Sequence, residues 1–183
     1  MKVELQNTEV VGVQNLRDEI PDFAKDIRLN LGVVLKTGES GLSENQIFGI
    51  ALASAYATKN IPVIKNILGE ALGVLSEAEI EATKSSASIM AMNNVYYRFA
   101  HLVSDKEYMN MPAGLRMNVI GNPGIDKVDF ELYALAVSAI NGCGMCMDAH
   151  VREIEKAGLS KQAVQHAVKI ASVITATAQA VTI

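Results

Sequence analysis

The stretch "DKVDFELYALAVSAINGCGMCMDAHVREIEKAG", residues 126–158, decides the fold, because it contains two helices and the break between them. Its first part is rich in Ala, Leu and Val and predicts a helix that stops near Asn141-Gly142. A second helix follows and is closed by Gly158, a residue typical of the position just after a helix. The same helix–break–helix pattern recurs along the chain and predicts an all-α fold.

Helix-start signals support this fold class in the rest of the chain. Ser76 is followed three residues later by Glu79, which is the sequence pattern of a capping box. Pro21 and Pro62 are expected in first helical turns, because a helix start leaves its N–H groups unpaired and proline has none. The other expected N-caps are Ser43 and Ser160.

Two segments lack a clear helical pattern. Residues 1–12 are expected to form a short irregular or extended arm. Residues 104–126 contain several prolines and glycines and predict a short helix between loops. Since no segment shows sustained alternation of apolar and polar residues, we expect no strands.

The composition fits close-packed helices in a single domain of residues 1–183. Hydrophobic residues make up 50% of the chain, whereas aromatic residues make up 5% and Trp is absent. Ala, Leu, Ile, Val and Met must therefore build the core, a mixture that suits helices better than sheets.

Charge and hydropathy argue against several classes of function. The net charge of -4 and the pI of about 5.4 offer no basic surface for nucleic acid or membrane lipids. The N-terminal residues lack the apolar core of a secretory signal, and no apolar run is long enough to span a bilayer. We therefore expect a cytoplasmic protein, in which a Cys-x-x-Cys pair indicates redox chemistry or metal binding more than a structural disulfide.

The two halves of the chain resemble each other. Shifted by 85 positions, "QIFGIALASA" (46–55) lies on "ELYALAVSAI" (131–140), and shifted by 84, "LSEAEIEATKSSASIM" (75–90) lies on "LSKQAVQHAVKIASVI" (159–174). Helical periodicity alone could produce part of this match, but the shared order of elements and the repeated Leu-Ser start favour duplication. We predict an internally duplicated helical unit with half-repeats at approximately 43–103 and 127–183.

The repeat identifies residues that the scaffold does not require. Glu131, Cys143, Cys146 and His150 of the second half lie where the first half has Gln46, Thr58, Ile61 and Lys65. The first half has the helices without these reactive groups, so helix packing does not explain them. The four residues of the second half are therefore candidates for chemistry.

Their spacing suits a thiol site. On a helix, Cys143 and Cys146 share one face and can close a small disulfide. A helix N-terminus favours a thiolate, and this effect alone would make Cys143 the attacking sulfur. His150, one turn beyond Cys146, favours Cys146 instead, because it can accept that proton. Glu131 can approach the pair if the chain turns back at Asn141-Gly142.

Other interpretations of these residues stay open. The two cysteines, the histidine and Glu131 could form a zinc set in a helical interaction module, although three ligands on one helix face would be crowded. Glu131 alone could be an ordinary acid near a helix start, and the cysteines small apolar core residues. His101 and His166 lack comparable neighbours and are expected to be structural or solvated. Met145 and Met147 could form an adaptable apolar wall.

The pattern Glu131-x11-Cys143-x2-Cys146-x3-His150 resembles the active-site signature of the alkylhydroperoxidase D family, within the carboxymuconolactone decarboxylase-like superfamily. The resemblance covers the whole chain: its length, its helical content, its repeat and the motif in the second half. It implies an all-α homotrimer that acts as an antioxidant peroxidase and disulfide reductase under oxidative stress.

The resemblance also implies partners and residue roles. Electrons would pass from NADH through dihydrolipoamide dehydrogenase to the dihydrolipoamide of a lipoylated acyltransferase, and then to organic hydroperoxides or to a peroxiredoxin, AhpC. Cys146 would be the peroxidatic cysteine, forming the sulfenic acid and the mixed disulfide with AhpC. Cys143 would be the proton donor and resolving thiol, with Glu131 and His150 as the proton relay. No bound cofactor or metal is implied.

One position departs from the family pattern. Some members have a histidine directly before the second cysteine, where this chain has Met145. This difference bears on the peroxidase rate more than on the fold or the disulfide cycle. The alternative is therefore a lipoamide-linked thiol–disulfide reductase with little peroxidase activity. Decarboxylation of a cyclic lactone fits less well, because the chain carries a redox pair.

Overall fold

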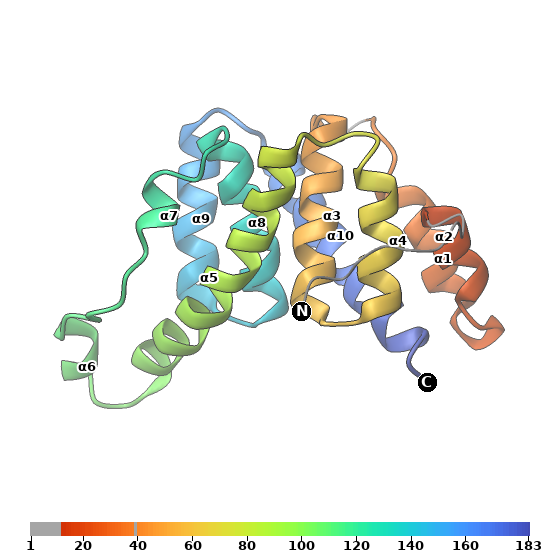
Figure 1. The fold of residues 1–183 in the computed structure, drawn as a ribbon. Helices are drawn as coiled ribbons and strands as arrows, with labels where there is room; N and C mark the ends of the chain where they lie inside the picture. Colours follow the sequence, from red (N-terminus) through yellow and green to blue (C-terminus); the bar gives the residue numbers. More distant parts are fainter. Residues whose placement is uncertain (1–11, 39) are drawn as a thin grey trace.

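The computed structural model describes residues 12–38 and 40–183, and every regular element in this part of the chain is a helix (Figure 1). The all-α prediction is confirmed for these residues, while the arm predicted for residues 1–12 lies almost entirely outside them. The elements are α1 (Val13–Glu19), a 3-10 helix (Asp22–Ala24), α2 (Lys25–Val34), α3 (Glu44–Thr58), α4 (Ile61–Ala71), α5 (Glu77–Leu102), α6 (Glu107–Asn110), α7 (Asn118–Gly121), α8 (Lys127–Ile140), α9 (Gly144–Lys156) and α10 (Lys161–Ala180).

Helices α3 and α8 form the centre of the molecule. They pack against each other, and each also packs against α5 and α10. Every residue from Ile47 to Ala55 is buried, as is every residue from Phe130 to Ser138. Both stretches consist mainly of small and aliphatic side chains, and a helix that is apolar on all sides belongs inside a core. The core of small and aliphatic side chains predicted from the composition therefore lies where these four helices pack together.

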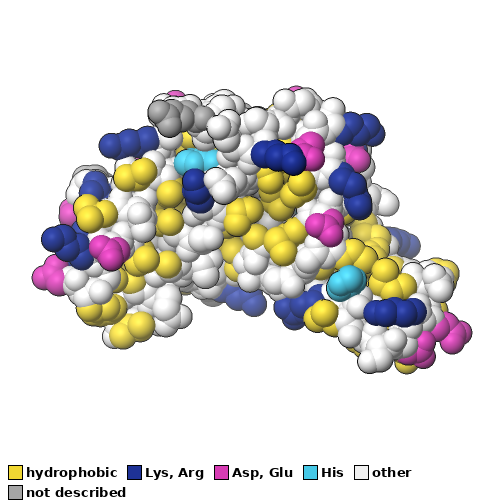
Figure 2. All heavy atoms as spheres, turned by 180° about the vertical axis from the view of Figure 1, so that it is seen from behind, with side chains coloured by type: hydrophobic (Ala, Val, Ile, Leu, Met, Phe, Trp, Pro, Cys, Tyr) yellow, Lys and Arg dark blue, Asp and Glu magenta, His cyan; other side chains and the backbone are white. Residues whose placement is uncertain are grey.

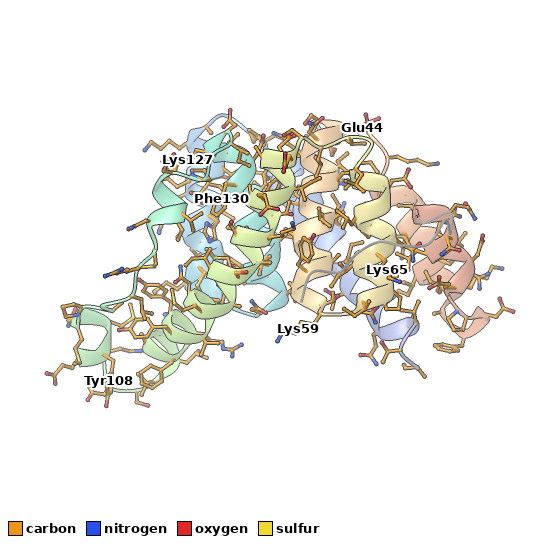
Figure 3. The ribbon with its side chains drawn as sticks, in the orientation of Figure 1. Glu44, Lys59, Lys65, Tyr108, Lys127 and Phe130 are labelled. Carbon is orange, nitrogen blue, oxygen red and sulfur yellow. A yellow bond between two sulfur atoms is a disulfide. The ribbon has the colours of Figure 1, made fainter. Side chains whose placement is uncertain are left out.

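The outer helices are arranged alike around α3 and α8. Helix α4 packs on α3 and contacts α10, while α9 packs on α8 and contacts α5. Figure 3 labels Lys65 on α4, the residue that the repeat matches with His150 on α9. The duplicated unit with half-repeats at 43–103 and 127–183 stays a prediction.

Local capping explains where the long helices begin. The capping box of Ser76 and Glu79 is present as predicted, and the Ser160 side chain accepts a hydrogen bond from the Ala163 amide. Ser43 is also the N-cap of α3, but it forms a full capping box with Gln46 that sequence reasoning had missed. These bonds satisfy amide groups that a helix start would otherwise leave unpaired.

Two segments differ in detail from their predicted structure. The first helical region is divided at Pro21, which caps the 3-10 helix leading into α2. Residues 104–126 contain two short helices, α6 and α7, where one was expected. Helix α6 lies in a lobe that projects beyond the end of α5 (Figure 1). None of the helices described is both long and apolar enough to cross a membrane.

Candidate active site: a dithiol beside a buried histidine–glutamate pair

The turn between α8 and α9 places the two cysteines. Helix α8 ends at Ile140, and Gly142 adopts a φ of 68°, a left-handed conformation that glycine enters without a steric penalty. The Gly142 amide donates to the Ala139 carbonyl and the Cys143 amide to the Ser138 carbonyl, which together form a Schellman motif. The predicted break at Asn141-Gly142 is confirmed, and it delivers Cys143 directly to the start of α9.

Cys143 directly precedes α9 and is its N-cap. Its sulfur accepts a hydrogen bond from the Cys146 amide at 3.3 Å. Cys143 and Cys146 are joined by a disulfide, with their Cα atoms 5.3 Å apart. Cys143 is 0% exposed and Cys146 is 7% exposed. The two sulfurs therefore have different surroundings although they are bonded to each other.

His150 and Glu131 form a buried pair beside the disulfide. The Nδ1 atom of His150 lies 2.6 Å from Oε2 of Glu131, and both side chains are less than 10% exposed. A carboxylate at this distance accepts a hydrogen bond, so Nδ1 carries the hydrogen and Nε2 stays free to exchange a proton. The sequence did not determine how close Glu131 on α8 comes to the residues of α9, and the structure shows that it contacts His150 directly.

A cavity of about 500 Å³ brings these groups together. Cys146, His150 and Glu131 line it, while Cys143 does not. Met145 also lines it, as does Lys127 at the start of α8, which is labelled in Figure 3. Sequence reasoning missed the contribution of α5 to this cavity, which is lined by Met90, Asn93 and Tyr97. Their shared face was readable from the helical spacing, but nothing in the sequence indicated which helix it would meet.

The cavity with the cysteine is not the largest hollow of the described surface. A hollow of about 720 Å³ lies against the ends of α3 and α8 and includes Lys59, Lys84 and Arg98. Neither cysteine, nor His150, nor Glu131 lines it. We place the candidate active site in the smaller cavity, because chemistry needs an accessible reactive atom rather than volume.

The other two histidines, His101 and His166, lie away from this cavity. His166 Nε2 lies 2.9 Å from the Val34 carbonyl and ties α10 to α2, whereas His101 is exposed at the end of α5.

Within the described residues, no group of three or more His, Cys, Asp or Glu side chains is arranged to hold a metal ion. The zinc interpretation therefore gains no support from the side-chain geometry.

The beginnings of α3 and α8 are joined by a polar contact near the site. Gln46, the residue that the repeat matches with Glu131, donates from Nε2 to Oδ1 of Asp129 at 2.8 Å. Burial raises the pKa of Asp129, and the hydrogen bond from Gln46 opposes this effect without cancelling it. The first half thus uses the position for a structural contact, whereas the second half directs Glu131 toward His150.

Comparisons with known proteins agree with the resemblance of the motif. The model of the carboxymuconolactone decarboxylase family matches residues 106–183. The protein named alkyl hydroperoxide reductase AhpD of Coxiella burnetii (strain RSA 493 / Nine Mile phase I) is 56% identical over 168 residues, covering 91% of this chain and 95% of the relative. Proteins of the same name from Rhodopseudomonas palustris (strain BisA53) and Brucella suis (strain ATCC 23445 / NCTC 10510) are 54% and 52% identical. These alignments cover 91% and 92% of this chain, and 91% and 95% of the relatives.

Proposed function

This chain belongs to the alkyl hydroperoxide reductase AhpD family, and we propose that it reduces organic hydroperoxides with the dithiol of Cys143 and Cys146. Its relatives are named as alkyl hydroperoxide reductases, and the chain is accordingly an oxidoreductase. One observation carries the assignment of the site: Cys146, His150 and Glu131 line one cavity, and Cys143 lies behind it, bonded to Cys146. A small peroxide in this cavity would meet a sulfur, a base and the group that orients the base.

We propose Cys146 as the attacking thiolate in the oxidative half of the cycle. His150 takes the Cys146 proton while Glu131 holds the imidazole ring in place. The thiolate attacks the terminal oxygen of R–O–OH, the O–O bond breaks, and the alkoxide takes the proton from His150 to leave as an alcohol. Cys146 is then a sulfenic acid, and the Cys143 thiolate attacks its sulfur, giving the disulfide and, with one proton, water.

The reductive half uses the difference in burial between the sulfurs. A thiolate of dihydrolipoamide attacks the accessible Cys146 sulfur, and Cys143 leaves as a thiolate. The amide hydrogen bond and the N-terminus of α9 stabilise negative charge on Cys143 as it leaves. The second thiol of dihydrolipoamide then releases Cys146, so two electrons have reached the protein and lipoamide is left as its cyclic disulfide.

We further propose that the same disulfide cycle keeps a peroxiredoxin, AhpC, reduced through a mixed disulfide at Cys146. The lipoylated acyltransferase and dihydrolipoamide dehydrogenase would supply the electrons from NADH. The name of the relatives belongs to the alkyl hydroperoxide reductase system, which supports the peroxiredoxin partner. A cycle that depends on cellular dithiols suits the cytoplasm, where thiols are kept reduced.

We also propose that the chain forms a homotrimer, which the exposed apolar side chains near the projecting lobe support. Figure 2 shows hydrophobic side chains gathered on and beside this lobe. A soluble protein rarely leaves a large apolar patch exposed unless something covers it. Light scattering should give a trimer for wild type and a smaller species for a Phe99→Glu, Leu102→Glu double variant. The exposed apolar residues of this region are Val95, Phe99, Leu102, Tyr108, Met109 and Met111.

An NADH-coupled assay with lipoylated donor and dehydrogenase tests the proposed function. Wild type should turn over cumene and tert-butyl hydroperoxide, and Cys146→Ser should lose both peroxide turnover and lipoamide-dependent reduction of AhpC. Ile61→Ser is the matched control, because Ile61 occupies the position of Cys146 in the first half. Activity retained by Cys146→Ser would refute the proposal. If wild type reduces disulfides but turns over no peroxide, the alternative function, a lipoamide-linked thiol–disulfide reductase, would be supported instead.

A further inference from the structure

Helix α5 carries two neighbouring asparagines near its middle, and the structure explains one of them. Asn94 donates from Nδ2 to the Ser138 hydroxyl at 2.9 Å, and its Oδ1 accepts from Nδ2 of Asn141 at 2.9 Å. These bonds hold α5 against the end of α8. Asn93, the other asparagine, is 5% exposed, and its Oδ1 atom is buried without a hydrogen-bond partner among the described residues.

An unpaired amide is an expensive feature at such a position. Buried polar groups in proteins are nearly always hydrogen-bonded, and asparagine is also a poor residue for the middle of a helix. Asn93 lies on the face of α5 that includes Met90 and Tyr97, and this face lines the same cavity as Cys146 and His150. The side chain of Asn93 therefore lines the space that a substrate would occupy, while its unpaired Oδ1 atom is itself enclosed.

We propose that Asn93 is a further catalytic residue, whose side-chain amide binds the –OOH group of the substrate; the inference rests on the function proposed above. The terminal O–H of the hydroperoxide donates to Oδ1, which holds the terminal oxygen toward the Cys146 sulfur. Oδ1 is enclosed as placed, and turning the amide by half a rotation about its last bond exchanges Oδ1 and Nδ2, so that the oxygen takes the place of the nitrogen to meet the substrate. The bond that forms is S–O and the bond that breaks is O–O, as in the cycle above, and Asn93 gains and loses no proton.

Binding at the –OOH group predicts a particular pattern across substrates. Every hydroperoxide carries this group, so loss of Asn93 should lower kcat/KM for hydrogen peroxide, tert-butyl hydroperoxide and cumene hydroperoxide by the same factor. One lost hydrogen bond to a reacting group corresponds to about 10- to 100-fold. A residue that only shaped the cavity would affect the bulky and the small peroxides differently.

Two variants with opposite volume effects separate hydrogen bonding from shape. Asn93→Ala enlarges the cavity, whereas Asn93→Leu keeps the branched shape of the side chain, is somewhat bulkier and removes both polar atoms. Both should lose peroxide turnover, and Asn93→Leu should melt no lower than wild type, because it replaces an unpaired amide in the middle of a helix. If Asn93→Ala does not fold, Asn93→Leu still gives the result.

The rate at which dihydrolipoamide reduces the Cys143–Cys146 disulfide serves as the internal control. It involves no hydroperoxide and should stay within about 2-fold of wild type in both variants, since 2-fold is less than the loss of one net hydrogen bond. Thr177→Ala is the matched control on α10, because Thr177 is also fully buried with an unpaired Oγ1 but does not line this cavity. It should leave both rates unchanged.

The outcomes distinguish this inference from the proposed function. If wild type turns over hydroperoxides and the Asn93 variants keep its kcat/KM, the role of Asn93 is refuted while the function stands. Equal losses in peroxide turnover and in disulfide reduction would also refute it, since they would indicate a structural role. If wild type itself turns over no hydroperoxide, the proposed function fails first.

Discussion

Gly49→Ala tests how tightly α3 and α8 are packed where they cross. Gly49 lies inside α3, where an alanine would normally favour the helix by about 1 kcal/mol. A methyl group at this position, however, would come closer than 3.0 Å to the hydroxyl oxygen and to ring carbons of Tyr133 on α8. Tyr133 is 0% exposed, so its ring has no open space to move into.

The expected size of the effect follows from these opposing contributions. Forcing an extra methyl group into a packed core costs about 1–3 kcal/mol, and the lack of free space around Tyr133 indicates the upper end. Subtracting about 1 kcal/mol for the helix preference leaves a net loss of about 2 kcal/mol in the free energy of unfolding. For a chain of this length, that loss lowers Tm by about 4–8 °C.

Thermal denaturation of wild type and variants at one fixed protein concentration provides the measurement, since assembly would make Tm depend on concentration. Gly121→Ala is the control, because a methyl group there would meet nothing within 4 Å. In a Tyr133→Leu background the obstacle is removed, so adding Gly49→Ala should cost nothing or stabilise. A Gly49→Ala protein as stable as wild type, or a loss that persists in the Tyr133→Leu background, would refute the packing argument.

Three further predictions concern the cap, a buried acid and the relay. Ser76→Ala should lower the free energy of unfolding by about 1 kcal/mol in chemical denaturation, because the capping box with Glu79 is lost, and an unchanged midpoint would contradict this. Burial raises the folded-state pKa of Asp129, so its ionised form costs stability above both pKa values. Asp129→Asn should therefore raise Tm at pH 7, with a gain that fades as the pH falls through the raised folded-state pKa of Asp129 and is lost below about 3.9, and a gain of equal size at pH 3 would count against it. Glu131→Gln should lower peroxide kcat/KM by about 10- to 100-fold, because the amide no longer orients His150 as the carboxylate does, and a wild-type rate in the coupled assay would exclude the relay.

Helix boundaries were predictable from the sequence where the determining interactions are local. The capping box of Ser76 and Glu79 spans four residues, and the break at Asn141-Gly142 depends on a single left-handed glycine. The bond that the Ser43 amide donates to Oε1 of Gln46 is just as local but was not predicted, because a serine alone already indicates an N-cap. The two short helices in residues 104–126 were harder to predict, since segments of four residues give no periodic signal.

The candidate site was predictable in its membership but not in its walls. The repeat isolated Glu131, Cys143, Cys146 and His150 because the first half lacks them. The 2.6 Å contact of Glu131 with His150 depends on how α8 and α9 pack, which residue spacing alone does not determine. Asn93 was missed for the same reason, because only the meeting of α5 with α9 makes it part of the cavity.

The structure also bears on the conflict between the two cysteines. A helix N-terminus stabilises negative charge on Cys143, and an imidazole favours reaction at Cys146, so residue spacing alone supports either sulfur as the attacker. Burial distinguishes them, because a peroxide or a dithiol can approach only a sulfur that lines the cavity, and Cys146 lines it while Cys143 is fully enclosed. In the proposed cycle, the hydrogen bond from the Cys146 amide would stabilise Cys143 as the sulfur that leaves when a dithiol attacks Cys146. In the proposed cycle, the helix N-terminus and the histidine would therefore support successive steps, one at Cys143 and the other at Cys146.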